Sequence, residues 1–217
     1  GAAGAAGAAW RSLGVGLTVI DGAVGRELIL PAVRELADLQ AAGSLDASRD
    51  PCNVGARSVW LHASTDEERS ERQRATPALL KLCALLFGLP FALDAAAKQC
   101  VHGDLDAPKL LVHPHVMAAT YGPGAEYHCH KDSYGGMDNQ RMVTVLLYLN
   151  DEWRPGDGGE LRIFGSADGG SKPDQGSYVD IEPLAGRLVL FRAREVWHAV
   201  LEPRKPRWAM TLWVMAE

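Results

Sequence analysis

The sequence lacks the features of several protein classes. It has four cysteines in 217 residues and no Cys-x-x-Cys pair, which argues against a zinc ribbon or a disulfide framework and favours a reducing compartment. No apolar run approaches the length of a membrane span, and the Gly/Ala-rich start lacks the pattern of a signal peptide. Lysine and arginine are not clustered, and the formal net charge is −5, which argues against a dedicated nucleic-acid surface. We therefore expect a cytoplasmic protein, with the nucleus as the alternative, that binds neither membranes nor nucleic acids.

The length of the chain suits one domain with a sizeable hydrophobic core. Residues 1–9 repeat Gly-Ala-Ala three times, a low-complexity composition that has little to bury. We predict a flexible Gly/Ala-rich tail over residues 1–15 and a single domain over residues 16–217. We also expect a monomer.

Two segments have the periodicity and end signals of helices. One is predicted over residues 25–42 and ends at Gly43, and a strongly apolar one is predicted over residues 78–87 and closed by Gly88 and Pro90. A capping box at 65–68 precedes a solvated helical face at 69–74. Short strands are predicted over 16–21 and 57–62. After residue 97, eight further strands are predicted, over 109–121, 125–132, 142–149, 160–164, 178–181, 187–191, 197–201 and 207–215.

Helices followed by eight strands separated by turns indicate a mainly β protein with flanking helices, of the α+β class. A β-sandwich or jelly-roll barrel fits this order better than a parallel sheet. Two Gly/Asp-rich connections, 133–140 and 165–176, are predicted to be long surface loops beside a site.

Metal-ligating residues lie on one predicted strand. Because side chains alternate between the two faces of a strand, His128, His130 and Asp132 are expected to share a face. Two imidazoles and one carboxylate can bind Fe(II) and leave three neighbouring coordination positions open. The predicted strand supplies a histidine and Asp132, and the distant His198 can supply the second imidazole. His128 competes with His130 as the second ligand. Arg207 begins an apolar strand, where an inward-facing cation needs an anion as its partner.

Five patterns in the sequence resemble one known family, the 2-oxoglutarate- and Fe(II)-dependent prolyl 4-hydroxylases. They are similar above all to its cytoplasmic branch, the hypoxia-inducible-factor prolyl hydroxylases and their protist and bacterial relatives. The patterns are Tyr121-Gly-Pro-Gly-Ala-Glu-Tyr127-x-x-His130-x-Asp132, Arg141-x-x-Thr144-x-x-x-Tyr148-Leu149-Asn150, Gly158-Gly159-Glu160-Leu161-Arg162-Ile163-Phe164, Asp180-Ile181-Glu182-Pro183, and His198 with Arg207.

The resemblance implies a double-stranded β-helix, with His130, Asp132 and His198 as the iron ligands. Arg207 and Tyr148 are then expected to hold the distal carboxylate of 2-oxoglutarate. Arg141 matches a position near the substrate groove. The remaining pocket positions that match the family are Met117, Tyr121, Leu146, Leu161, Val200, Thr211 and Trp213. The implied cofactors are Fe(II), 2-oxoglutarate as cosubstrate and O2, with ascorbate as a further candidate.

The expected activity is hydroxylation of a proline in an intracellular protein partner, with a role in oxygen sensing. Candidate targets by family are a transcription factor, a ubiquitin-ligase adaptor, elongation factor Tu and a ribosomal protein. A first alternative is a 2-oxoglutarate-dependent hydroxylase of a small molecule or free amino acid. A second is a cupin-like metal-binding module without catalysis, which has no reason to place Arg207 and Tyr148 beside the metal.

Overall fold

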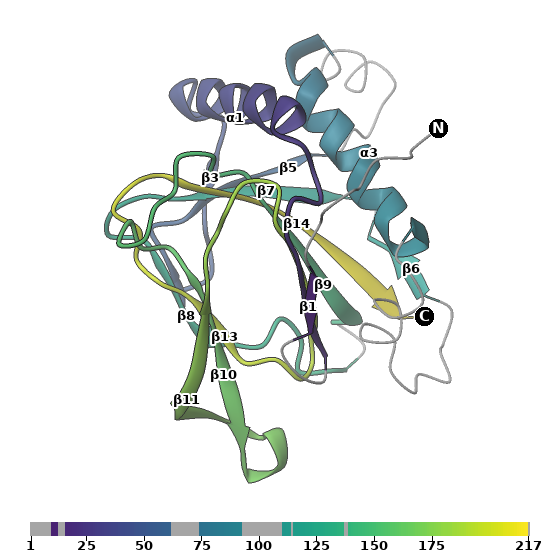
Figure 1. Ribbon diagram of the computed structural model, residues 1–217, viewed down its shortest axis with the longest axis vertical. Helices are drawn as coiled ribbons and strands as arrows, with labels where there is room; N and C mark the ends of the chain where they lie inside the picture. Colours follow the sequence, from purple (N-terminus) through teal and green to yellow (C-terminus); the bar gives the residue numbers. More distant parts are fainter. Residues whose placement is uncertain are drawn as a thin grey trace.

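Two antiparallel sheets and a pair of helices are arranged in layers (Figure 1). The computed structural model describes residues 10–12, 16–61, 74–92, 110–113, 115–136 and 139–216. The predicted capping box at 65–68 and the helical face at 69–73 lie outside the described residues. The two sheets form the double-stranded β-helix that was expected, so the mainly β fold with flanking helices is confirmed.

The larger sheet has the strand order β1-β2-β12-β9-β14-β7-β5-β3, and β6 also pairs with β14. Its strands are β1 (Trp10–Ser12), β2 (Leu17–Ile20), β3 (Asp46–Ala47), β5 (Arg57–Leu61), β6 (Leu110–Val112), β7 (Val116–Tyr121), β9 (Arg141–Tyr148), β12 (Leu188–Arg192) and β14 (Arg207–Ala216). The single strand predicted over 109–121 is thus two strands, β6 and β7, which both pair with β14.

The smaller sheet has the order β11-β10-β13-β8-β4. Its strands are β4 (Asn53–Val54), β8 (Glu126–His130), β10 (Leu161–Ala167), β11 (Lys172–Ile181) and β13 (His198–Val200). Each predicted strand from 125–132 onward has a counterpart in one of the two sheets. The predicted metal ligands therefore lie at neighbouring strands of the smaller sheet.

Two apolar clusters account for the layers. One lies between the sheets and joins residues such as Val19, Leu146 and Val189 of the larger sheet to Leu161 and Ile163 of the smaller one. The other lies on the opposite face of the larger sheet, beneath the helices. The alternation of side chains along each central strand thus fills both clusters at once.

Helices α1 (Arg26–Ala41) and α3 (Pro77–Ala92) cover the outer face of the larger sheet (Figure 1). Helix α1 confirms the prediction over 25–42 and buries Ile29, Ala32 and Leu36. Helix α3 is longer than predicted, since it continues past Gly88 and Pro90. Its start is fixed by α1, because the carboxylate of Glu35 accepts hydrogen bonds from the first free backbone amides of α3 at 2.9 and 2.8 Å.

Two segments, one predicted loop and part of the predicted tail, differ from the prediction. The segment 165–176 is not a long loop, because β10 and β11 extend through it as a hairpin closed by a 3-10 turn at Asp168–Gly170. Near the other end of the chain, Trp10–Ser12 pair with Thr18–Ile20 as strand β1, so part of the predicted 1–15 tail belongs to the sheet. Backbone pairing with a distant or neighbouring strand supplies the order that the local composition does not predict.

Candidate metal and cosubstrate site

An irregularity in strand β8 decides which histidine faces the interior. His198 lies opposite His130 and Val200 lies opposite Tyr127, so β8 has one residue more than β13 between these two pairs. Such a β-bulge breaks the regular alternation of faces. The ring of Tyr127 therefore stacks on that of His130, with centroids 3.7 Å apart. The side chain of His128 is 53% exposed and pairs with Glu126 instead.

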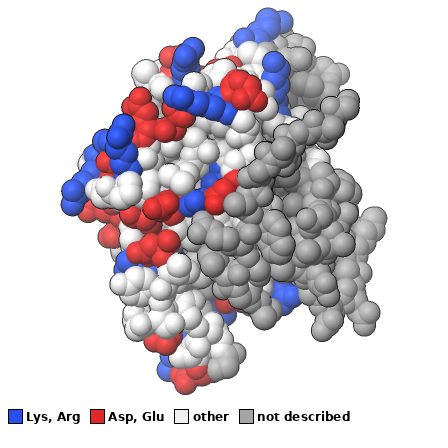
Figure 2. All heavy atoms as spheres, in the orientation of Figure 1, with Lys and Arg blue, Asp and Glu red and all other residues white. Residues whose placement is uncertain are grey.

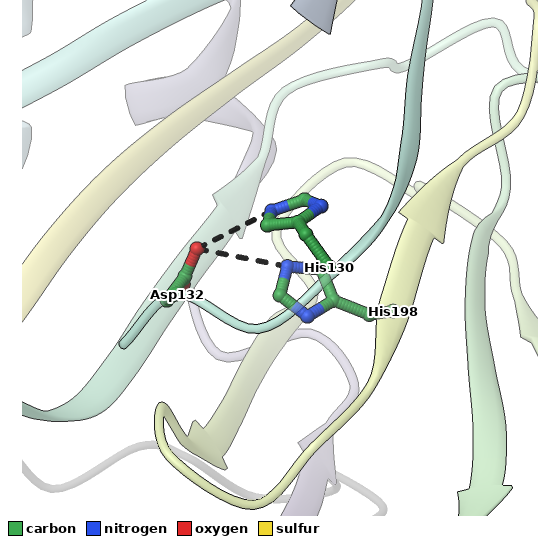
Figure 3. Close-up of side chains that lie close together, drawn as sticks. All are labelled: His130, Asp132 and His198. Atoms are coloured by element: carbon green, nitrogen blue, oxygen red, sulfur yellow. Dashed lines mark ion pairs between the residues drawn. The ribbon is translucent and has the colours of Figure 1, made fainter. Parts of the chain in front are cut away.

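The prediction that His128 shares the face of His130 and Asp132 is therefore wrong. The extra residue of the bulge turns His128 to solvent, and it resolves the choice between the two histidines. Among the described residues, only His130, Asp132 and His198 gather as a group that can hold a metal ion, with ligand atoms within 4.8 Å of one another. Oδ1 of Asp132 lies 3.5 Å from Nε2 of His130 and 3.7 Å from Nε2 of His198 (Figure 3).

Both histidines are oriented by the backbone. Nδ1 of His130 lies 2.7 Å from the carbonyl oxygen of His128, and Nδ1 of His198 lies 3.1 Å from that of Val196. A carbonyl oxygen only accepts, so each Nδ1 carries the proton and donates it. The Nε2 atoms are left with their lone pairs directed at Asp132, which is the tautomer that a metal ligand needs.

The second carboxylate oxygen of Asp132 is held by two donors. Thr144 Oγ1 on β9 donates a hydrogen bond to Oδ2, and Trp213 Nε1 on β14 donates another at 3.3 Å. Oδ1 is thereby directed toward the imidazoles. Thr144 belongs to a pattern of the family resemblance, but its role is visible only once β9 and β8 are placed together.

The protonation states suit metal binding. Burial lowers the pKa of His198 to about 4, so its imidazole is neutral at neutral pH. Burial by itself raises the pKa of Asp132, but the neighbouring imidazoles of His198 and His130 and the hydrogen bond from Thr144 bring it well below its usual range. An ionised carboxylate and a neutral imidazole are the ligand forms that a divalent metal requires.

Arg207 is a buried cation at the other end of the same pocket. Its Nε donates to the carbonyl oxygen of Gly159 at 2.9 Å, and its Cζ lies 5.2 Å from the ring of Tyr121 and 5.0 Å from that of Tyr148. No carboxylate of the described residues forms an ion pair with it. A buried guanidinium in this setting needs an anion from a ligand.

Two buried tyrosines supply neutral groups beside that cation. Burial raises the pKa of Tyr121 to about 12 and raises the pKa of Tyr148 as well, so both hydroxyls keep their protons. The hydroxyl of Tyr148 is buried and has no hydrogen-bond partner among the described residues. Such an unpaired donor is costly unless a ligand accepts from it.

The glycine pair at 158–159 allows the approach of Arg207. Gly159 has φ of +78°, and a Cβ atom there would lie 3.3 Å from Cγ and Cδ of Arg207 and 3.0 Å from Cβ of Pro203. Only glycine adopts this backbone conformation freely. The carbonyl of Gly159 can thus reach the guanidinium, which explains the glycines in a pattern that otherwise looks like a simple turn.

The remaining predicted pocket residues lie together. The lining of the pocket contains all seven that were expected, namely Met117, Tyr121, Leu146, Leu161, Val200, Thr211 and Trp213. It also contains Tyr127, Thr144, Phe191, Ala119 and Ala209, for which no role was predicted. Tyr148 does not belong to this lining, but its ring lies 5.0 Å from Cζ of Arg207.

Arg141 lies at one side of this pocket and covers an aromatic ring. Its Cζ is 3.9 Å from the ring of Trp213, in the range of a cation–π contact. The rings of His113 and His115 pack near Trp60 and Trp213 in an aromatic cluster.

A second cavity, of about 410 Å³, lies on the far side of Arg207 between helix α1 and the turns around residues 150–158 and 205–208. It is larger than the pocket at the histidines, but no group of metal-ligating side chains gathers in it among the described residues. The cysteines that the structure describes, Cys52, Cys83 and Cys129, are free thiols. No described helix is both long enough and apolar enough to span a membrane.

The residues present fit an iron ion. Nε2 of His130 is buried and has no hydrogen-bond partner among the described residues, and two neutral imidazoles with one carboxylate are the donor set of the facial triad of Fe(II) oxygenases. The three ligands meet at one side of the pocket, and Arg207 lies at another. The triad and a cation that can pair with a carboxylate therefore line the same pocket.

Comparison with known families agrees with this arrangement. Residues 116–215, which run from β7 to β14 and contain the triad and Arg207, match the family model of the 2OG-Fe(II) oxygenase superfamily. Fe(II) at the His-Asp-His triad with 2-oxoglutarate as cosubstrate is the cofactor set of that superfamily. The cofactor prediction is therefore confirmed at this level.

Solved structures with the same fold include two prolyl hydroxylases. A prolyl-4-hydroxylase of Pseudomonas putida is 25% identical, with a TM-score of 0.63 and 94% of each chain covered. A prolyl hydroxylase of Trichoplax adhaerens, in complex with a peptide of the hypoxia inducible factor oxygen degradation domain, is 23% identical, with a TM-score of 0.69 and coverage of 93% of this chain and 84% of that one.

A third similar structure has another activity. The non-heme α-ketoglutarate-dependent epimerase SnoN of nogalamycin biosynthesis is 14% identical, with a TM-score of 0.62 and coverage of 93% of this chain and 77% of that one. The fold alone is therefore shared by a prolyl hydroxylase in complex with a peptide and by an epimerase of nogalamycin biosynthesis.

Proposed function

We propose that this protein is a prolyl 4-hydroxylase that couples oxidative decarboxylation of 2-oxoglutarate to hydroxylation of a proline in an intracellular protein. The observation that carries the proposal is the juxtaposition, in one pocket, of the triad and a buried Arg207 that has no carboxylate partner among the described residues. A metal-binding module without catalysis has no use for that cation.

Different residues of the pocket would bind the metal, bind the cosubstrate and orient the metal ligands. His130, Asp132 and His198 would hold Fe(II), and Arg207 with the hydroxyl of Tyr148 would hold the distal carboxylate of 2-oxoglutarate. Thr144 and Trp213 fix Asp132, and two backbone carbonyls fix the histidine rings. When bound, Fe(II) with 2-oxoglutarate and O2 supplies the oxidising power for inserting oxygen into a C–H bond. The apolar lining around the triad excludes bulk water from that position.

A prolyl substrate is favoured by two aromatic rings in the lining of the pocket. Tyr127, stacked on His130 and hydrogen-bonded to Asp50 at 2.7 Å, and Trp213, covered by Arg141, line the space next to the ligands. Flat aromatic rings pack well against a pyrrolidine ring, which has no hydrogen-bond donor of its own. The identity of 25% to the Pseudomonas putida enzyme supports the same substrate class.

The proposal is tested in two steps. Purified protein loaded with Fe(II) is expected to convert 2-oxoglutarate to succinate in the presence of O2, and Arg207→Ala is expected to lose this conversion. Treatment of a cell lysate with the enzyme, followed by mass spectrometry, is expected to show a gain of one oxygen on proline. Succinate formation with oxygen gained on no prolyl residue would refute the substrate class and leave the oxygenase assignment intact.

The similarity to SnoN favours a second candidate, a 2-oxoglutarate-dependent enzyme of a small molecule or free amino acid. The same succinate assay separates the two candidates when free proline and proline-containing peptides are compared as substrates. Stimulation by free proline alone would support the second. The proposal has four further parts: oxygen sensing, a requirement for ascorbate, a monomeric state, and a cytoplasmic or nuclear location. Measurement of the KM for O2 tests the role in oxygen sensing.

A further inference from the structure

The outer face of the smaller sheet carries a row of aromatic side chains. Phe164 on β10 lies directly opposite Tyr178 on β11, with ring centroids 6.5 Å apart. On the other side of β10, the backbone amide of Phe164 donates to the carbonyl of Trp197 at 2.9 Å, next to the pair of Ile163 and His198. Because Ile163 and His198 face inward, Phe164 and Trp197 face outward.

The row continues toward the mouth of the site. The ring of Tyr134, on the loop that follows Asp132, lies 6.0 Å from that of Trp197 at 66°. Tyr134 is 71% exposed and Tyr178 is 53% exposed. We call Tyr134, Trp197, Phe164 and Tyr178 the aromatic row. Phe164 and Trp197 are partly buried between these two exposed rings. A contiguous group of accessible aromatic side chains on a surface is typical of an interaction site.

Hydrogen bonds fix the end of the aromatic row that lies nearest to the metal ligands, at Trp197. Trp197 Nε1 and Lys131 Nζ both donate to the carbonyl of Gly170 at the tip of the β10–β11 hairpin, at 3.1 and 2.8 Å. Lys131 Nζ also lies 4.7 Å from the ring of Trp197. Lys131 and Trp197 directly precede the ligands Asp132 and His198 in the sequence, so this end of the row is continuous with the metal site.

The charges beside the row favour a neutral or basic partner. Arg162 lies over Tyr178, with Cζ 3.9 Å from the ring, but its guanidinium already makes two hydrogen bonds of 2.7 Å with Asp180. The hairpin from residue 161 to 182 has two basic residues and four acidic ones. Figure 2 shows a largely uncharged surface over the end of the molecule where Figure 1 draws this hairpin. Phosphate groups of a nucleic acid would meet few free cations here.

We propose that the aromatic row binds a proline-rich segment of the polypeptide substrate, with basic flanking residues, in the polyproline II conformation. Trp197 and Tyr178 lie two strands apart, which corresponds to about 9.6 Å at the usual strand spacing. One turn of a polyproline II helix advances by about 9.3 Å. A segment that crosses the strands can therefore place one proline against each of the two rings, as in other aromatic surfaces that recognise such helices.

The inference rests on the proposed function, because it assigns part of the substrate of the same site. A bound segment would leave the row at Tyr134 and reach the triad along residues 132–134, which directly follow β8. The row therefore serves as a docking surface outside the pocket. It is expected to raise the affinity for long substrates without taking part in the chemistry.

The test measures binding separately from turnover. A fluorescein-labelled oligoproline with lysine at both ends is titrated with the full chain, and its Kd is measured by fluorescence anisotropy. Tyr178→Ala is expected to raise Kd by roughly three- to tenfold, whereas Tyr178→Phe keeps the ring and the affinity. Val179→Ala is the matched control, because Val179 is 40% exposed on the same strand but lies opposite the inward-facing Ile163.

Three results would overturn the inference. They are an unchanged Kd in Tyr178→Ala, equal binding of a glycine–serine peptide of the same length and charge, and preferred binding of single-stranded oligouridine. The titration is repeated with His198→Ala, which lacks a metal ligand, so that binding of the peptide is measured in the absence of turnover. If Tyr178-dependent oligoproline binding is found but no prolyl residue is hydroxylated, the docking surface stands and the proposed function fails. If prolyl hydroxylation is found without such binding, only the docking surface fails.

Discussion

The two ends of the smaller sheet differ in how their side chains are held. At the ligand end, the side chains of His130, Asp132 and His198 are at most 12% exposed, and every ligand has a second contact that fixes its orientation. At the hairpin end, Phe164 and Tyr178 lie beside each other, Tyr178 is exposed, and the neighbouring Arg162 is paired with Asp180. Both ends belong to the same antiparallel ladder, in which β10 pairs with β13 and with β11.

This difference separates chemistry from recognition. Buried ligands with fixed tautomers and a fixed carboxylate bind a metal without reorganisation, and a change there is costly because a buried polar group loses its partner. Exposed rings on a hairpin are replaced at little cost to stability. Changes at the ligand end should therefore abolish or strongly reduce function, while changes at the hairpin end should alter the affinity for one class of ligand.

The largest effect is expected from removal of a ligand. His198→Ala should reduce succinate formation to background and abolish stoichiometric binding of Fe(II), because two side chains are too few to hold the ion. His128→Ala is the matched control and should keep iron binding and turnover within about twofold, since surface changes are usually near neutral. Iron content is measured by a colorimetric assay after desalting. Equal loss of iron in the His128 variant would contradict the ligand assignment.

Acidification of the metal-free protein is expected to reduce stability at the ligand end. The pKa of His198 is about 4 in the folded protein and near 6.5 in the unfolded chain. Between these values the unfolded state binds more protons, so the free energy of unfolding falls as the pH falls, by up to about 3 kcal/mol. The low pKa of Asp132 acts in the same direction at still lower pH.

This pH dependence is measured as the melting temperature of the EDTA-treated protein between about pH 7 and pH 4.5. His198→Gln removes the titrating group and should flatten the curve, whereas His128→Gln, on the exposed side of β8, should leave it unchanged. A wild-type slope in the His198 variant would show that other groups account for the acid sensitivity.

Arg207→Lys should lower the affinity for 2-oxoglutarate and leave the affinity for Fe(II) unchanged. Lysine keeps the charge but loses the planar fork that can hold both oxygens of a carboxylate. Loss of one charge-assisted hydrogen bond corresponds to about a tenfold to hundredfold rise in the dissociation constant of 2-oxoglutarate. Tyr148→Phe removes a neutral donor and should have a smaller effect of the same kind. Isothermal titration with iron present measures both. Wild-type affinity for 2-oxoglutarate in the lysine variant would reopen the non-catalytic alternative.

The smallest of these effects is expected at the support of the carboxylate. Thr144→Val keeps the shape of the side chain but removes the hydrogen bond to Oδ2 of Asp132. Loss of such a partner lowers metal affinity by about tenfold in comparable sites. Thr144→Ser, which retains the hydroxyl, should restore most of the affinity. Failure of serine to restore it would show that packing of the methyl group, and not the hydrogen bond, is what Asp132 needs.

Much of the site could be predicted from the sequence. The residues His130, Asp132, His198 and Arg207 were identified from their types, their spacing and a family resemblance, and the pocket contains all four. Helix α1 and the strands from 125 onward followed from periodicity and turn residues. These features are local, because a strand or an amphipathic helix is specified by the side chains within its own segment.

The tertiary structure alone decided three other points. The outward orientation of His128, which the alternation of a regular strand does not predict, comes from a bulge that exists only in the pairing of β8 with β13. The donors to Asp132 come from Thr144 and Trp213 on two other strands. The segment 165–176 became a hairpin because β10 and β11 pair along it. The sequence by itself determined which groups are available for the chemistry. Their orientation depended on hydrogen bonds between strands far apart in the chain, whose register no local pattern encodes.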